Sequence, residues 1–196
     1  MEILIALVSL LLGWILAILK DLFNNHLSKR ERARYLALRV VYVLEMFIDD
    51  CLRVAKDDGL LNGPDWQGCL NFQTSYAKID FQSLDVDWKS LSFDLTYEII
   101  NFPSKVEAAI DIIENAAEFG DGPPHYEEET EERRLQHARL GLLADELSTR
   151  LRAKYNIPNK ERDVTKSFDK LIDEVEKFRA KRLERQAELN RQLSQK

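Results

Sequence analysis

The chain opens on an apolar segment and continues with several stretches of helical periodicity. Residues 3–19 carry no charge, and only Ser9 and Gly13 interrupt a run of Ile, Leu, Val, Ala and Trp. At 1.5 Å rise per residue such a helix is about 25 Å long, close to the roughly 30 Å hydrocarbon core of a bilayer. A helix satisfies every backbone group within one segment, as lipid requires. The pattern predicts a transmembrane anchor over residues 1–23.

Two other interpretations of this segment stay open. A cleaved signal peptide has a basic start, a shorter apolar core and small residues at its cleavage site. Here the segment starts with Met1 and Glu2, and Lys20 and Asp21 follow it. A buried helix of a soluble domain is the other alternative, but such helices rarely run this far without a charge. Both alternatives fit the segment less well than a retained anchor does.

Basic residues gather on the C-terminal side of the apolar segment, whereas Glu2 precedes it. The positive-inside rule therefore predicts that the rest of the chain lies in the cytoplasm. We expect a single-pass protein of the inner or plasma membrane, and the few cysteines fit a reducing compartment. The basic side chains expected at the membrane interface are Lys20, Lys29, Arg30, Arg32 and Arg34.

The next helix is expected to begin at Ser28, because Ser28 to Glu31 matches a capping box that follows the polar residues 24–26. It should end near Gly59. Its apolar face is so wide that we expect this helix at the centre of a bundle. The face comprises Leu36, Val40, Val43, Leu44, Phe47, Cys51 and Val54, widened by Val41, Tyr42, Met46, Ile48 and Leu52.

Residues 59–87 contain turn signals and no strong period, so an irregular insert is expected there. Apolar residues from Trp88 to Phe102 then recur at helical spacing. Pro103 is expected to end that helix, and a second capping box at Ser104 is expected to start another that stops near Phe119.

Two long helices are predicted in the C-terminal part. After a loop at 121–124, residues 127–155 begin with an acidic turn and end with basic residues, as the helix dipole favours. Gly141 lies inside this pattern, where it favours close approach of a second helix. The last helix starts near Lys160 and carries a heptad seam. The seam consists of Phe168, Leu171, Val175 and Phe178, which we predict to bind a partner, and from Arg179 the helix should project or fray.

These elements predict an all-α protein: a single N-terminal transmembrane helix followed by an antiparallel helical bundle with a long charged C-terminal helix. The expected divisions are an anchor at 1–23, a cytoplasmic bundle at 24–158 with the irregular insert at 59–87, and a C-terminal amphipathic helix at 159–196. Of the 196 residues 45% are hydrophobic, which excludes a disordered chain. Two cysteines exclude a disulfide scaffold and a four-thiolate zinc site.

The distribution of charge and the possible catalytic or metal-binding residues leave the predicted architecture unchanged. The net charge of −6 conceals −11 over residues 45–121, between +3 before them and +2 after them. The acidic residues 127–132 are typical of a helix start, and binding of a cation or a basic partner is the alternative. The three histidines lack metal-ligand spacing, and no phosphate-binding glycine loop occurs. We expect no metal, no cofactor and no enzymatic activity.

The sequence thus favours a membrane-anchored helical interaction or sensing module. Its expected partners are the lipid bilayer and either a second copy of the chain or another helical protein. A membrane-tethered enzyme with a dispersed carboxylate site is one alternative. The other is a regulatory or defence protein whose basic C-terminal helix contacts nucleic acid, although the acidity of the whole chain argues against nucleic acid as the main partner.

Overall fold

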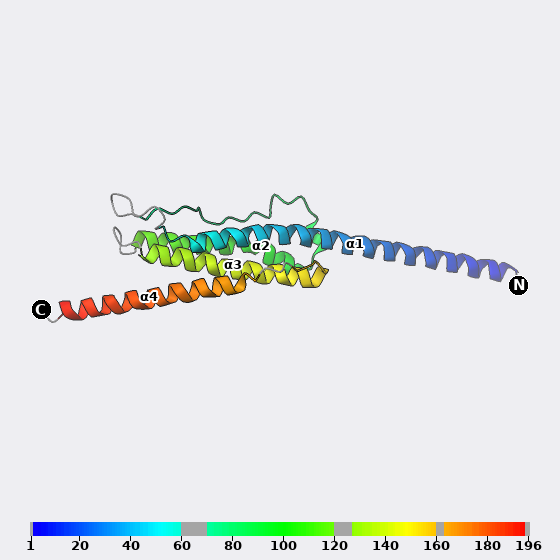
Figure 1. The fold of residues 1–196 in the computed structure, drawn as a ribbon. Coiled ribbons are helices and arrows are strands. Elements are labelled where there is room, and N and C mark those ends of the chain that lie inside the picture. The colour runs from blue at the N-terminus through cyan, green and yellow to red at the C-terminus, as the bar shows by residue number, and fades with distance from the viewer. Residues whose placement is uncertain (1, 60–69, 120–126, 160–162, 195–196) are drawn as a thin grey trace.

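The computed structural model of the chain is an all-helical bundle over the residues it describes, 2–59, 70–119, 127–159 and 163–194 (Figure 1). Within residues 2–27 it describes the helix backbone and two side chains, Trp14 and Lys20. No strand occurs in these ranges, so the predicted helical bundle is confirmed. The elements are α1 (Glu2–Lys56), a short 3-10 helix η1 (Trp88–Ser90), α2 (Phe93–Phe119), α3 (Glu127–Tyr155) and α4 (Thr165–Leu193).

Helix α3 lies at the centre of the bundle and packs against α1, α2 and α4. In its C-terminal half, Arg152 pairs with Glu45 of α1 and Arg150 pairs with Glu98 of α2. Helices α1 and α2 run in the same direction, and α3 runs opposite to both (Figure 1). The bundle is therefore antiparallel only in part, because residues 70–92, the returning segment, run back along the length of the bundle before α2 begins (Figure 1).

Helix α1 is continuous from Glu2 to Lys56, so the expected helix start at Ser28 is wrong. The Ser28 hydroxyl accepts a hydrogen bond from Arg32 one turn later, at 3.2 Å, as a side chain within a helix does. Polar residues lower helix propensity by less than about 0.7 kcal/mol each. That cost is too small to break a helix whose following turns are fixed by burial, from Ala33 onward.

None of the helices, within the described part of the chain, is long and apolar enough to cross a membrane. Most side chains of the predicted span, residues 3–19, lie outside the described residues. The transmembrane anchor therefore has no support from the described part and stays a prediction. The predicted loop at 121–124 and the residues around 160 also lie outside the described ranges.

Helix α2 runs through Pro103, so the expected break there is wrong. Residues 88–90 form η1, and the α-helix begins only at Phe93. A proline inside a helix removes one hydrogen bond and costs about 3 kcal/mol. Burial of the apolar face on both sides of the proline outweighs this cost. That buried face comprises Leu95, Ile99, Phe102, Val106, Ala109 and Ile113.

The core is closed by aromatic side chains and by the end of α3. The rings of Phe47 and Phe102 meet edge to face with their centres 5.6 Å apart. Asn156 adopts a left-handed conformation (φ 51°), and the Ile157 N–H donates to the Arg152 carbonyl at 3.0 Å. This Schellman-type cap ends α3 and buries Ile157 against the bundle.

Candidate functional site

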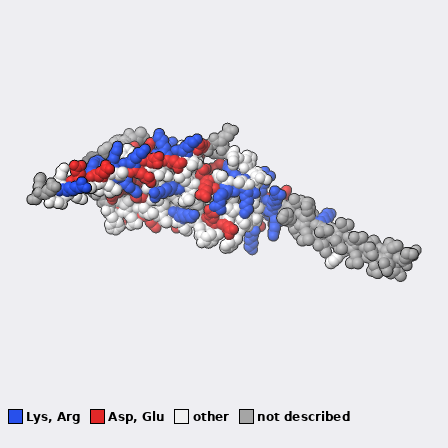
Figure 2. Space-filling view, turned by 90° about the horizontal axis from the view of Figure 1, so that it is seen from below, with Lys and Arg blue, Asp and Glu red and all other residues white. Residues whose placement is uncertain are grey.

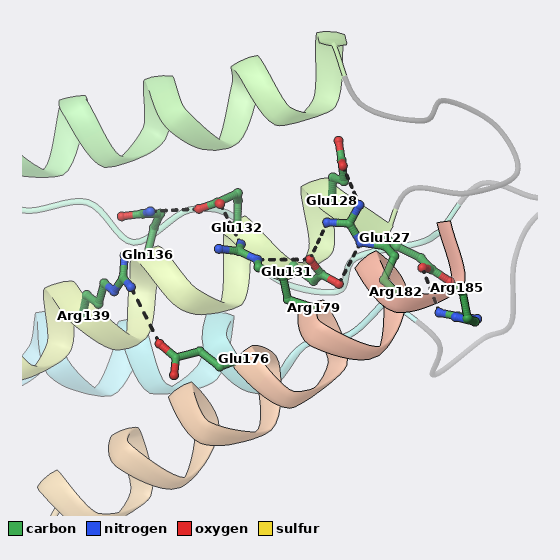
Figure 3. Close-up of polar contacts among 10 residues, drawn as sticks. All are labelled: Glu127, Glu128, Glu131, Glu132, Gln136, Arg139, Glu176, Arg179, Arg182 and Arg185. Atoms are coloured by element: carbon green, nitrogen blue, oxygen red, sulfur yellow. Dashed lines mark hydrogen bonds and ion pairs between the residues drawn. The ribbon is translucent and has the colours of Figure 1, made fainter. Parts of the chain in front are cut away.

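The acidic start of α3 binds the chain's own C-terminal helix. Arg182 on α4 is 7% exposed and Glu131 on α3 is 8% exposed. The Nε and Nη2 atoms of Arg182 donate to the two carboxylate oxygens of Glu131 at 3.2 and 2.9 Å, and Nη1 donates to Glu128 (Figure 3). These hydrogen bonds raise the pKa of Arg182 above its ordinary value. The two-pronged contact fixes the position of α4 along α3.

Two further arginines extend this contact, so that the charge cluster spans two turns of each helix. Arg179 donates to Glu131 at 3.3 Å and to Glu132 at 2.7 Å, and Arg185 donates to Glu127 at 3.4 Å (Figure 3). The expectation that α4 projects or frays from Arg179 is therefore wrong as far as Arg185. The heptad positions after Phe178 are occupied by Arg182 and Arg185 because the residues that face them on α3 are carboxylates.

A second polar cluster fastens the returning segment to α3. The Arg133 guanidinium is buried between the rings of Phe72 and Tyr76, 4.4 and 4.9 Å from their centres. It donates to the carbonyl and the hydroxyl of Thr74, and it lies 4.0 Å from Asp57. Arg133 thereby connects the end of α1, the returning segment and α3.

Asp57 organises the returning segment at the end of α1. Its Oδ2 accepts hydrogen bonds from the backbone N–H groups of Gln73 and Thr74 at 2.8 Å and from the Thr74 hydroxyl at 2.7 Å. Burial acts to raise the pKa of Asp57, but these hydrogen bonds and one from Gly59 outweigh it and hold the pKa below its ordinary value. The ionised carboxylate is thus part of the fold.

His137 is a structural residue beside this cluster. Its side chain is fully buried and stacks on Tyr76. The Ala77 N–H donates to Nε2 at 3.3 Å, and Nδ1 lies 2.8 Å from the Arg133 carbonyl oxygen. These contacts assign a neutral imidazole whose Nδ1–H donates. Burial lowers its pKa to about 4.

Acidification from pH 7 to pH 5 is expected to remove about 2 kcal/mol of stability through His137. The folded chain keeps the imidazole neutral down to about pH 4, whereas the unfolded chain takes up a proton near pH 6.5. Stability therefore falls as the pH falls below about 6.5. Urea unfolding at the two pH values measures this loss. His137→Gln keeps an acceptor for Ala77 without titrating, and an unchanged pH dependence in this variant would exclude His137 as its source.

The five basic residues predicted at the membrane interface are all exposed on α1: Lys20, Lys29, Arg30, Arg32 and Arg34. Arg32 lies 3.9 Å from Asp87, and Arg34 donates to the Asn156 carbonyl at 3.4 Å. Lys and Arg side chains gather at the end of the bundle from which α1 protrudes (Figure 2). Contact with lipid at this basic end stays a prediction.

The four residues predicted to bind a partner are divided by the structure. Phe168, Leu171 and Val175 are buried in the chain's own core, and Phe178 is 58% exposed. The predicted close approach at Gly141 is confirmed, because a Cβ there would lie 2.2 Å from Cζ of Phe168. The first half of the seam thus packs within the molecule. Partner binding at these four residues stays a prediction.

Candidate catalytic groups are dispersed over the described part of the chain. No group of three His, Cys, Asp or Glu side chains within it is arranged to hold a metal ion. Cys51 is fully buried, and burial raises the pKa of its thiol. Cys69, His125 and the His26 side chain lie outside the described residues.

A polar cavity of about 150 Å³ lies between α1, α3 and the start of α4. Its lining includes three carboxylates, Glu45, Asp49 and Asp145, together with Arg152, which is paired with Glu45. Asp145 also accepts a hydrogen bond from the Thr165 hydroxyl at 3.3 Å. A dispersed carboxylate site, as in the enzyme alternative, would have its residues here.

An apolar stripe lies on the outer face of α1, where the sequence pattern predicts residues of the core. This α1 stripe consists of Tyr35, Leu38, Tyr42 and Met46, and each of the four is at least half exposed. The predictions that Tyr42 and Met46 lie in the core and that α1 is the central helix are therefore wrong. The residues recur at intervals of three and four, so a second helical stripe was visible in the sequence.

No family model matches this chain, and the searches of curated proteins and of solved structures give no significant match.

Proposed function

We propose that this chain is a single-pass membrane protein whose cytoplasmic helical bundle acts as an interaction module without catalytic activity. The observation that carries the proposal is the continuity of α1, which leads as one helix from residue 2 into the bundle (Figure 1). A continuous helix has no flexible linker, so it would hold the bundle at a set height and orientation with respect to the bilayer.

The order of residues along α1 supports a membrane anchor that continues into the bundle, which we call the membrane tether. The uncharged residues 3–19 come first, the basic residues between Lys20 and Arg34 follow, and the packed part of the helix begins at Ala33. Basic side chains next to a span favour the cytoplasmic side, and each contributes about 1 kcal/mol of attraction to anionic lipid. An anchored chain would therefore present its bundle to the cytoplasm.

The buried polar side chains hold segments of the fold together, which supports a role in interaction rather than in catalysis. Arg133, His137 and Asp57 hold the returning segment, and Arg182 and Glu131 hold α4. In contrast, large apolar side chains lie on the outside of α1 and α2. Exposed apolar patches of this kind are typical of surfaces that bind another protein.

Flotation of the full chain with lipid vesicles under alkaline conditions tests the tether. Wild-type chain is expected to float and to resist extraction, whereas Leu7→Asp/Leu11→Asp is expected to stay in the soluble fraction. Each aspartate costs about 3 kcal/mol at the centre of a span. The matched control is Leu183→Asp/Leu189→Asp, which changes two exposed leucines on α4 and is expected to float. Extraction of the wild-type chain, or flotation of the Leu7 and Leu11 variant, would contradict the proposal.

A further inference from the structure

Two outer faces of the bundle carry exposed apolar stripes. One is the α1 stripe, Tyr35, Leu38, Tyr42 and Met46. The other, the α2 stripe, consists of Phe93, Tyr97 and Ile100, of which Phe93 is 81% exposed. Both stripes lie on the exposed side of their helix, opposite its buried face. Exposed aromatic and aliphatic side chains at helical spacing are suited to packing against another helix.

The two stripes lie at the same height along the bundle. Helices α1 and α2 are parallel (Figure 1), and Phe47 of α1 contacts Phe102 of α2. Leu38 is nine residues before Phe47, and Phe93 is nine residues before Phe102. With 1.5 Å of rise per residue, both lie about 13 Å from the Phe47–Phe102 contact, in the same direction. Tyr42 is five residues before Phe47 and Tyr97 is five residues before Phe102, so these two tyrosines also lie at one level.

The two helices carry net charges of opposite sign. Residues 28–46 of α1 contain five basic and two acidic side chains, whereas α2 contains six acidic and one basic. Arg39 and Asp94 are each eight residues from the Phe47–Phe102 contact, so they also share a level. The Arg39 guanidinium donates to the Tyr35 hydroxyl at 3.1 Å and lies over its ring, which leaves it beside the α1 stripe.

We propose that the partner of this bundle is a second copy of the chain, with the α1 stripe of one copy packed against the α2 stripe of the next. Complementary charge selects this pairing over α1 against α1 or α2 against α2. The interface is heterologous, since each copy contributes two different faces. This inference rests on the proposed membrane tether, which would keep all copies upright in one orientation. Because the stripes lie at one height, successive copies would add side by side in the plane of the membrane.

Mixing of two complementary variants tests the pairing. Leu38→Asp damages the α1 stripe only, and Tyr97→Asp damages the α2 stripe only. Each variant of the full chain in detergent is expected to be monomeric, whereas the wild-type chain forms assemblies in mass photometry. An equal mixture of the two variants is expected to give dimers that grow no further, because it contains one intact pair of faces. Leu183→Asp, an equally exposed leucine on α4, is the control and should assemble as the wild type does.

Charge exchange supplies an independent test that leaves the apolar side chains in place. Arg39→Asp and Asp94→Arg are each expected to weaken assembly at least about tenfold, and the double variant is expected to restore it. A monomeric wild-type chain, a mixture that stays monomeric or a double variant that is not restored would overturn the inference. Alkaline flotation of the same variants separates the two proposals, since a chain that floats but stays monomeric contradicts self-association alone. Circular dichroism verifies that each variant is folded.

Discussion

Replacement of Arg182 by methionine is expected to lower the free energy of unfolding by about 3 kcal/mol. The substitution leaves the Glu131 carboxylate buried without its two-pronged partner. Arg179 still reaches Glu131 at 3.3 Å, which places the loss at the lower end of the range for a broken buried ion pair. Urea unfolding of the full chain, followed by circular dichroism, measures the difference.

Two further variants test whether the loss of stability comes from leaving one charge of a buried ion pair without its partner. Arg185→Met removes an exposed pair with Glu127 and is expected to cost less than about 1 kcal/mol. Arg182→Met/Glu131→Met removes both buried charges and is expected to recover most of the loss, because an apolar pair of similar volume replaces them. Equal losses for Arg182→Met and Arg185→Met would contradict a buried ion pair between α3 and α4.

Phe168→Ala is expected to destabilise the chain by about 3 to 5 kcal/mol. The ring is fully buried and lies directly against the backbone of α3 at Gly141, so its removal leaves a cavity between α3 and α4. Phe178→Ala on the same helix is the matched control, since its ring is exposed and its loss should cost less than about 1 kcal/mol. Equal losses in thermal unfolding would show that α4 does not pack through Phe168.

The effect of Gly141→Ala on the free energy of unfolding is expected to change sign when the Phe168 ring is removed. In the wild-type chain Gly141→Ala is expected to destabilise, because the new Cβ would lie 2.2 Å from the Phe168 ring. In the Phe168→Ala background the same substitution is expected to stabilise by up to about 1 kcal/mol, since alanine is the better helix former. The same sign in both backgrounds would contradict the contact between these two residues.

Periodicity in the sequence predicts the helical segments whose apolar residues are buried. Residues 127–155 form α3 as expected, and Phe168, Leu171 and Val175 pack as the seam indicates. Local signals were less reliable. The capping box at Ser28 and the proline at 103 are worth about 1 to 3 kcal/mol each. Burial of the helix faces around them outweighs such amounts.

Contacts between distant segments were beyond the reach of the sequence. The pairing of Arg182 with Glu131 joins residues 51 positions apart, and that of Arg133 with Thr74 joins residues 59 positions apart. Nothing in either local pattern marks such charges as buried. The exposure of Tyr42 and Met46 depends in the same way on which face of α1 the rest of the chain covers. Here α3 and the returning segment cover the opposite face.

We propose that α1 passes from the bilayer into the bundle as one helix, and hydrogen exchange of the backbone amides of residues 3–19 measures whether this part of α1 is a helix in the bilayer. In the full chain bound to lipid vesicles these amides are expected to be protected far more strongly than those of residues 186–193 near the exposed end of α4. The Leu7→Asp/Leu11→Asp variant should lose this protection. Exchange of residues 3–19 at the same rate with and without vesicles would contradict the claim.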